Sequence, residues 1–349
     1  MTHVIDVALR TAASGAPLDV ALADEFMNEL MQGRVSPIQT AGLISALAVR
    51  GEQASEIAGF ARAMRRHALQ MTAPVGSIDT CGTGGDGADT FNISTTVALI
   101  AAAAGIPVAK HGNRAASSKS GSADVLQALG ARIDLDAAQC EQMLGRTNLC
   151  FLFAQTFHPA MKHAATVRKE LGFRTIFNIL GPLTNPAQTR RQVLGVFRAD
   201  LVETVAQALA ELGVDHVLVV HGADGLDELS ISGPSTVAEV RGKDVQLRTI
   251  EPEQIGLARA DVSALRGGDA QHNANVICEL FNGQHGPKRD IVLLNAAAAL
   301  YVGGKAKNLQ QGVAQARKLI DSGAALRKLH EFVAASQAVA SLDAEVVQQ

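Results

Sequence analysis

The hydrophobic pattern of the chain changes at Pro74, and this change constrains the fold more than any other feature. Before Pro74, apolar residues recur at the three- and four-residue spacing of amphipathic helices, as in the stretch 22–30. Ser36 and Pro37 are typical of a helix start, because serine caps the first turn and proline fits the first helical position. We therefore predict a small all-helical domain over residues 1–73.

After Pro74, short apolar runs alternate with helical patterns. The runs expected to form strands are SIDTC, IPVAK, LCFLFA, VLGVFR and HVLVVHG, at residues 77–81, 106–110, 149–154, 193–198 and 216–222. This alternation predicts an α/β domain over residues 74–349, with a central, mostly parallel sheet flanked by helices. Two later runs, at 236–242 and 244–250, lie close enough in sequence to form a local antiparallel pair, and the remainder is mostly helical.

Composition excludes several classes of partner. The formal net charge is −3, and aromatic residues make up 3% of the chain with no Trp, so neither a basic surface nor stacking platforms for nucleic acid are expected. The longest apolar segments are too short to cross a membrane. The four cysteines are widely spaced and form no C-x-x-C pair, which favours reduced thiols and a cytoplasmic location.

The stretch DTCGTGGDGADTFNISTT, residues 79–96, contains the spacing G-x-G-x-x-G. That spacing is shared with dinucleotide-binding loops, but three features argue against a nicotinamide site here. Gly87 stands too far ahead of the next helix, the next strand ends in Lys110 and His111 rather than an acid, and Asp86 would repel a pyrophosphate held by amides alone. Another phosphate site or a simple glycine-rich turn remains open at this point.

The run KHGNRAASSKSGSAD, residues 110–124, follows the adjacent strand and is rich in donors and small residues. Together with the hydroxyl-rich helix start NISTT, it can surround several phosphate oxygens. Taken alone it is also compatible with a flexible surface loop. A third loop, HGADGLDELSI at 221–231, is acidic, and carboxylates opposite two phosphate loops favour a magnesium ion that bridges them to a phosphorylated substrate.

Five motifs in this order resemble the anthranilate phosphoribosyltransferase family: GTGGD, N-x-S-T, KHGNRAASSKSGSADVLQALG, FNILGPLTNP and HGADGLDE. The resemblance runs from the helical N-terminus to near residue 330. It implies a helical domain, joined by part of 165–190, that is hinged to the α/β domain and forms a homodimer. The substrates it implies are 5-phosphoribosyl pyrophosphate (PRPP) and anthranilate, with up to two Mg²⁺ ions per chain.

The resemblance also implies roles for individual residues. Contacts to PRPP are expected from Gly82, Gly85, Asp86, Thr90, Asn92, Ile93, Ser94, Thr95, Lys110, His111, Gly112, Asn113, Arg114, Ala115, Ala116, Ser117, Ser118 and Ser122. Contacts to anthranilate are expected from Gly82, Asn113, His158 and Arg168, with the hinge residues Gly181 and Pro182 nearby. The metal ligands are expected to be Ser94, Asp227 and Glu228.

These residues suit the displacement of pyrophosphate from PRPP by an amine. Such a reaction needs positioned substrates and neutralised charge more than it needs an acid–base pair. Lys110, Arg168, Asp227 and Glu228 are expected to act electrostatically, and no general base is assigned. Without the resemblance, Arg168 would be interpreted as a surface residue of a helix over 160–171. Two alternatives remain: a pyrimidine nucleoside phosphorylase of the same fold, which would not need the acidic pair, and a non-enzymatic relative that binds nucleic acid through the basic loop.

Overall fold

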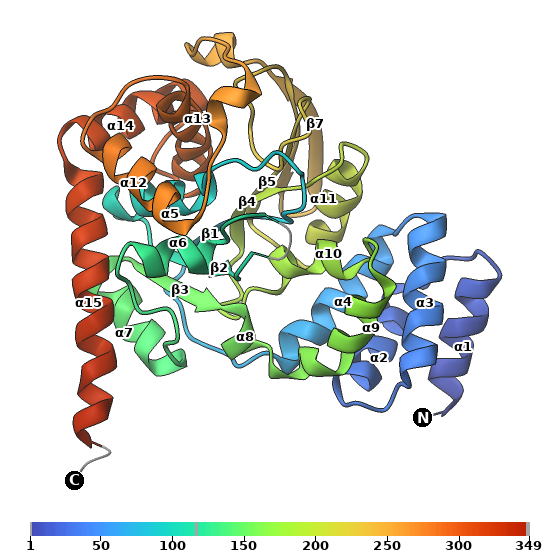
Figure 1. Ribbon diagram of the computed structural model, residues 1–349. Helices are drawn as coiled ribbons and strands as arrows, with labels where there is room; N and C mark the ends of the chain where they lie inside the picture. The colour runs from blue at the N-terminus through green and yellow to red at the C-terminus, as the bar shows by residue number, and fades with distance from the viewer. Residues whose placement is uncertain (1, 116–117, 347–349) are drawn as a thin grey trace.

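The computed structural model describes residues 2–115 and 118–346, which form a helical part beside a larger part built around a sheet (Figure 1). The helical part contains α1 (Thr2–Ala13), α2 (Val20–Met31), α3 (Pro37–Arg50) and α4 (Ala54–His67). As predicted, Pro37 is the first residue of α3. Ser36 caps this helix by accepting from the amide of Gln39, whose side chain accepts in return from the amide of Ser36.

The larger part contains one sheet of seven strands in the order β3-β2-β1-β4-β5-β6-β7. The strands are β1 (Ile78–Gly82), β2 (Val108–Gly112), β3 (Leu149–Phe153), β4 (Arg191–Gly195), β5 (His216–Gly222), β6 (Ser235–Arg241) and β7 (Asp244–Ile250). The first five run parallel, and β6 and β7 are antiparallel additions at one edge. Both the mostly parallel α/β sheet and the antiparallel pair predicted from the sequence are confirmed.

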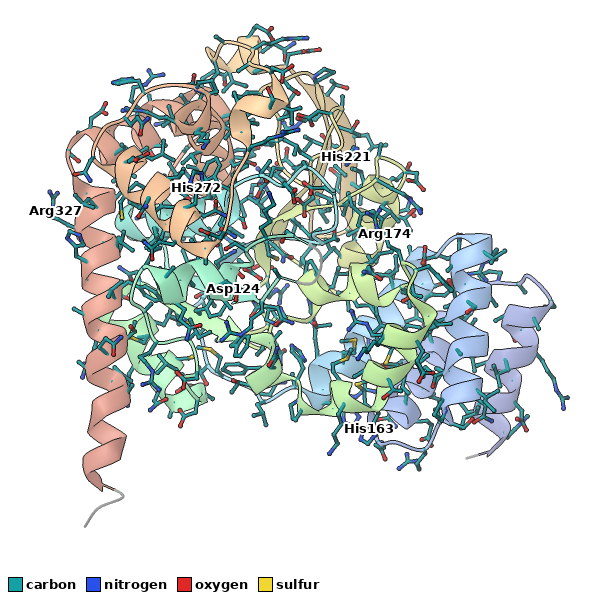
Figure 2. The ribbon with its side chains drawn as sticks, in the orientation of Figure 1. Asp124, His163, Arg174, His221, His272 and Arg327 are labelled. Carbon is teal, nitrogen blue, oxygen red and sulfur yellow. The ribbon has the colours of Figure 1, made fainter. Side chains whose placement is uncertain are left out.

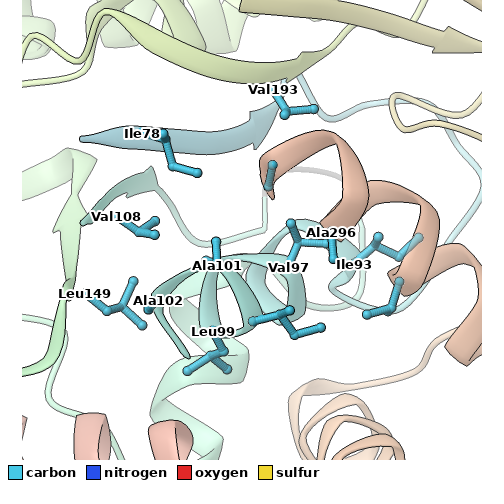
Figure 3. Packing of buried hydrophobic residues seen from close by; sticks show 14 of the residues in the cluster. Ile78, Ile93, Val97, Leu99, Ala101, Ala102, Val108, Leu149, Val193 and Ala296 are labelled. Atoms are coloured by element: carbon cyan, nitrogen blue, oxygen red, sulfur yellow. The ribbon is translucent and has the colours of Figure 1, made fainter. Parts of the chain in front are cut away.

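Two hydrophobic clusters lie against the sheet. The first joins β1–β3 to α5 (Ile93–Ala103), α13 (Pro287–Val302) and other C-terminal helices, and Figure 3 shows Val97 of α5 beside Ala296 of α13. The second continues from β4–β6 through α11 (Leu201–Glu211) into the four N-terminal helices. The helical part is thus packed against the sheet through α11.

The chain returns to the helical part after β3. There, α9 (Lys162–Leu171) and α10 (Phe177–Leu180) contribute Ala164, Val167 and Phe177 to the same cluster as α1–α4. We keep a division at residue 73, with part of 165–190 added to the helical domain, as our proposal for the domain organisation.

The remaining elements connect or cover these parts. They are α6 (Ser122–Ala128), α7 (Ala137–Thr147), α8 (Ala154–Phe157), α12 (Ala270–Phe281), α14 (Leu309–Asp321), α15 (Ala324–Val346) and four short 3₁₀ turns at Pro159–Met161, Gly181–Thr184, Pro252–Ile255 and Val262–Leu265. In the part of the chain that the structure describes, no helix is long and apolar enough to span a bilayer.

Candidate active site

A cavity of about 650 Å³ opens at the carboxyl ends of the parallel strands. Its lining includes Gly82 and Gly112, which end β1 and β2, Ala154 directly after β3, and Asp227 in the loop that follows β5. Helices α9 and α10 of the helical part form the opposite wall through Arg168 and Phe177. Open α/β sheets bind ligands at this edge, because the loops after neighbouring strands converge there.

The cavity brings together all the site residues predicted from the sequence that the structure describes. Its walls include Gly82, Gly85, Asp86, Thr90, Asn92, Ile93, Ser94, Thr95, Lys110, His111, Gly112, Asn113, Arg114, Ala115, Ser118, Ser122, His158, Arg168, Gly181, Pro182, Asp227 and Glu228. Ala116 and Ser117 lie outside the described residues. Shared placement in one cavity is a geometric result, and the role of each residue remains a prediction.

The glycine loop after β1 is built for close approach to the acidic loop. A Cβ added to Gly82 would overlap the carboxylate of Asp227, and one added to Gly195 would overlap the carbonyl oxygen of Asp227. The amide of Gly84 donates a 2.7 Å hydrogen bond to Asp227 Oδ2. Gly84 has a φ of 66°, which favours glycine. The glycines therefore allow the backbone conformation of the loop and leave room for Asp227, which lies 143 residues after Gly84 in the chain.

Three carboxylates meet at this end of the cavity. Burial and then the charge of Asp86 raise the pKa of Asp227, and burial and then the charge of Asp227 raise the pKa of Glu228 well above its usual value. Like charges in one buried pocket need a counter-ion, and hard oxygen ligands are those that Mg²⁺ prefers. The oxygen donors thus fit Mg²⁺ in kind, although the described residues contain no group of three or more His, Cys, Asp or Glu that could hold a metal ion.

Lys110 supplies a positive charge at the end of the cavity where the three carboxylates meet. Only 2% exposed, it donates to the carbonyl of Thr80 and, at 3.3 Å, to Ser94 Oγ. Ser94 lies in the first turn of α5, where free backbone amides favour an anion. Next to it, Thr95 Oγ1 is buried and has no hydrogen-bond partner among the described residues.

Asp124 on α6 shapes the donor-rich loop after β2, a role that sequence reasoning missed. Its carboxylate accepts from the amides of Ala115 and Gly121, both at 2.9 Å, and pairs with Arg114 at 2.8 Å (Figure 2). Burial opposes ionisation of Asp124, but these three partners outweigh it and lower the pKa. The capping position of Asp124 at the start of a helix was visible in the sequence, whereas its reach back to Ala115 was not.

The other end of the cavity is apolar and carries two neutral imidazoles. Burial, followed by the charge of His158, lowers the pKa of His111 to about 3, and burial lowers the pKa of His158 to about 4. His111 Nδ1 donates to the carbonyl of Gly181 at 3.1 Å, so its Nε2 carries a lone pair. Nε2 of both rings is buried without a partner among the described residues, and the ring centroids are 5.0 Å apart.

Arg168 closes this end of the cavity. Its guanidinium lies over the ring of Phe177, 5.3 Å from the centroid, and no carboxylate of the described residues forms an ion pair with it. A guanidinium without a protein carboxylate is available to pair with a carboxylate on a ligand. Other lining residues that the sequence did not indicate include Met64, Asp89, Ser120, Gln155, Met161, Lys162, Asn178 and Thr184.

Gly181 and Pro182, expected near a hinge, are held firmly to the α/β domain. Their carbonyls accept from His111 and Gln192, at 3.1 and 2.8 Å. Gly181 has an ordinary helical φ of −49° and open space where a Cβ would lie, so neither conformation nor clearance requires glycine here. Hydrogen bonds from β2 and β4 thus join this wall of the cavity to the sheet, and the hinge role of the segment stays a prediction.

Arg174 links the helical part to the glycine loop, again without a sequence signal. It lies in the segment between α9 and α10, donates to the carbonyl of Gly85, and covers the ring of Phe197, 4.5 Å from the centroid (Figure 2). This contact ties one wall of the cavity to the other.

Comparison with known proteins supports the same fold and shows the family. The helical bundle domain and the a/b domain of the glycosyl transferase family match residues 7–68 and 75–326. Anthranilate phosphoribosyltransferases from Rubrobacter xylanophilus and Thermomicrobium roseum are 51% and 52% identical over 334 and 347 residues, which cover 95% and 97% of this chain and 98% and 99% of theirs. The chain belongs to the anthranilate phosphoribosyltransferase family.

Solved members of the family share this architecture. The enzyme from Thermus thermophilus superposes with a TM-score of 0.89 at 45% identity, covering 95% of this chain and 99% of its own. The enzyme from Saccharomyces cerevisiae, in a structure with PRPP and Mg, has a TM-score of 0.85 at 28% identity, covering 96% and 98%. The family predicted from the five motifs is therefore confirmed.

Proposed function

We propose that the chain transfers the phosphoribosyl group of PRPP to the amine of anthranilate and releases pyrophosphate, the second step of tryptophan biosynthesis from chorismate. One observation carries this proposal: a single cavity holds an anion-binding end with paired carboxylates and an apolar end with an unpaired guanidinium. The first end suits a polyphosphate with a cation, and the second suits an aromatic carboxylate. Both substrates then meet at the centre of the cavity.

At the polyphosphate end, we assign PRPP to the glycine loop, the start of α5 and the donor-rich loop up to Ser122. Lys110 and the amides around Gly84 face the departing pyrophosphate. Each donor aimed at developing charge contributes about 3–4 kcal/mol of transition-state stabilisation in comparable sites. Ser94, Asp227 and Glu228 would hold Mg²⁺, with up to two ions per chain. When bound, the ion neutralises the charge that accumulates on pyrophosphate.

At the apolar end, Arg168 pairs with the carboxylate of anthranilate, while Phe177 and Met161 cover the ring. We assign Nε2 of His111, which carries a lone pair, and the unpartnered Nε2 of His158 to the amine, so that its nitrogen is directed toward C1 of the ribose. This assignment places His111, which the resemblance counts among the PRPP contacts, beside both substrates. An aromatic amine is already neutral and nucleophilic, so the reaction requires orientation rather than deprotonation before attack. The neutral state of both imidazoles serves this purpose, because protonated rings could not accept.

We also propose that the chain is a cytoplasmic homodimer joined through its helical domain. Ile38 and Val49 on α3 are 85% and 90% exposed. They lie eleven residues, or about three helical turns, apart on one face of α3. Two large apolar side chains exposed on one face of a helix support an interface there if neighbouring apolar surface completes the patch. A second copy of the same helix is the partner that the proposed symmetric dimer supplies.

Anthranilate fluorescence provides the test of the proposed activity. Protein, anthranilate, PRPP and Mg²⁺ are mixed, and the emission of anthranilate is followed; the chain has no Trp to interfere. We expect a decay that requires both PRPP and Mg²⁺. The nucleoside phosphorylase alternative is measured in parallel with uridine or thymidine and phosphate. Cleavage of a nucleoside without consumption of anthranilate would replace our proposal by that alternative.

A further inference from the structure

The segment Leu265–Asn273 carries the sequence LRGGDAQHN, for which no role has been assigned so far. It connects the 3₁₀ turn Val262–Leu265 to α12, and Asp269 caps this helix by accepting from the amide of His272 at 2.8 Å. The cap explains Asp269 as a helix start. It does not explain the two glycines before it or the buried asparagine one turn later.

Gly267 allows this segment to lie directly on the cavity loop Asp89–Asn92, whereas a Cβ on Gly268 would meet the side chain of His272. The amide of Gly267 donates to the carbonyl of Asp89 at 2.8 Å, and the amide of Phe91 donates to the carbonyl of Leu265 at 3.3 Å. A Cβ added to Gly267 would lie 2.7 Å from the amide nitrogen of Phe91. Because that contact is with backbone, a side chain at Gly267 would push the two segments apart.

Asn273 lies in α12, is only 1% exposed, and contacts both segments. Its Oδ1 accepts from the amide of Gly268 at 2.8 Å, and its Nδ2 donates to Asn92 Oδ1 at 2.9 Å. Asn92 in turn donates through Nδ2 to the carbonyl of Ser120 at 3.1 Å. Asn92 lines the cavity, whereas Asn273 does not.

This chain of hydrogen bonds determines which way the amide of Asn92 points. Asn273 Nδ2 donates to Asn92 Oδ1, so a 180° rotation of the Asn92 amide would place two NH₂ groups against each other. Asn92 Nδ2 has two hydrogens, and Ser120 uses one of them. The other is left for a ligand oxygen in the cavity.

We propose that Asn273 is a positioning residue that acts through Asn92 to orient a donor toward the phosphorylated substrate. The inference rests on the proposed function in taking that substrate to be PRPP. It assigns a role to the Gly-Gly-Asp-x-x-x-Asn segment: Gly267 permits contact, Asp269 starts the helix, and Asn273 holds Asn92. The residues that the proposed function assigns to the amine and carboxylate of anthranilate, His111, His158 and Arg168, have no hydrogen bond to Asn92 or Asn273.

Replacement of Asn273 by Asp provides the test, because it keeps the shape and the acceptor for Gly268 but puts an acceptor against Asn92 Oδ1. PRPP binding is measured by calorimetry with Mg²⁺ and no anthranilate, and the KM of each substrate is measured by fluorescence. Loss of one positioned hydrogen bond corresponds to about a tenfold weaker PRPP affinity. The KM for anthranilate at saturating PRPP stays at the wild-type value.

Two control variants separate the proposed effect on PRPP binding from a general effect of an added charge or of lost stability. Asn275→Asp makes the same replacement on an exposed position of α12, and Thr147→Val removes a buried hydroxyl of α7, remote from the cavity lining. Both are expected to bind PRPP as the wild type does. Gly267→Ala is expected to weaken PRPP binding as Asn273→Asp does, since it displaces the same loop.

A folded Asn273→Asp variant with wild-type affinity for PRPP would overturn the inference. The inference would also be overturned if Thr147→Val and Asn273→Asp lowered thermal stability equally and also weakened PRPP binding equally. The effect of Asn273→Asp would then come from stability alone. The proposed reaction is judged separately. If the wild type binds PRPP but consumes no anthranilate, and Asn273→Asp still weakens binding, the reaction is rejected and the positioning role stands.

Discussion

The buried carboxylate of Asp79 on β1 accepts a 2.8 Å hydrogen bond from the side-chain amide of Asn185, which lies 106 residues further along the chain. The amide of His111 donates to the other oxygen of Asp79 at 3.1 Å. Asp79 therefore holds both β2, which carries Lys110 of the polyphosphate end, and the segment that carries Gly181. The polyphosphate and anthranilate walls of the cavity share this one anchor.

We expect Asp79→Asn to reduce the free energy of unfolding by about 1–3 kcal/mol, because the new amide faces a donor in a buried site. Urea denaturation followed by circular dichroism measures this change. Asp134→Asn is the matched control, since Asp134 is exposed and paired with Arg132 at the surface, and its effect should be about 0–1 kcal/mol. If both substitutions reduced the free energy of unfolding equally, the proposed anchoring role of Asp79 would be refuted.

Arg168→Ala is expected to raise the KM for anthranilate by about ten- to hundredfold, because loss of a bidentate charged pair costs about 1.5–3 kcal/mol. The KM for PRPP should change little. Steady-state kinetics with each substrate varied in turn separates the two effects. Lys169→Ala, at the next position of α9 and outside the cavity lining, should leave both values unchanged. An Arg168 variant impaired for PRPP alone would contradict the assignment.

The double variant Asp227→Asn with Glu228→Gln is expected to lose Mg²⁺ dependence and most of kcat together. Neutral amides relieve the repulsion between buried carboxylates but bind Mg²⁺ much more weakly. Activity titrated with Mg²⁺, and calorimetry of Mg²⁺ with PRPP, measure the two consequences. Asp224→Asn in the same loop, outside the cavity lining, is the control. Full activity of the double variant at ordinary Mg²⁺ concentrations would exclude these residues as ligands.

The buried histidines predict how stability depends on pH. In the folded chain their pKa values are lowered to about 3 for His111 and about 4 for His158, while in the unfolded chain both titrate near 6.5. The unfolded state therefore takes up protons first, so the stability present above pH 6.5 is lost as the pH falls toward 4. Each histidine contributes a slope of up to about 1.4 kcal/mol per pH unit. Urea denaturation of His158→Asn between pH 7 and 5 should show a shallower decline than the wild type.

Ile38→Glu with Val49→Glu is expected to convert the proposed homodimer into a monomer, because two charges would face their symmetry copies across an apolar contact. Sedimentation velocity measures the mass directly. Val75→Glu is the control, since Val75 is also exposed but lies outside the helical part. A wild-type chain that sediments as a monomer at micromolar concentration would refute the dimer.

Local sequence patterns predicted the elements well where the signal is itself local. The capping box at Ser36, the alternating strands and the hairpin after β5 follow from periodicity and turn chemistry within a few residues. The family motifs likewise indicated the cavity walls, because each motif is continuous in the chain. Strand ends moved by up to three residues, as at β4, since pairing with neighbours decides where a ladder stops.

Contacts between distant segments were not predictable in this way. Nothing near Gly195 in the sequence shows that it must clear Asp227, and nothing near Asn273 shows that it meets Asn92, 181 residues away. Side-chain partners of this kind depend on which strands become neighbours and on how closely the backbones approach. Asp124, Arg174 and Asn185 were missed for the same reason.

The sequence by itself determined that this chain has a helical N-terminal part, a mostly parallel sheet, and glycine-, donor- and carboxylate-rich loops at the ends of its strands. Only the tertiary structure decided how closely these loops approach one another and that buried residues such as Asp79 and Asn273 hold the walls of the cavity. The physical reason is range: periodicity and capping act over a few residues, whereas burial brings polar groups together across the whole chain and requires each to find a partner.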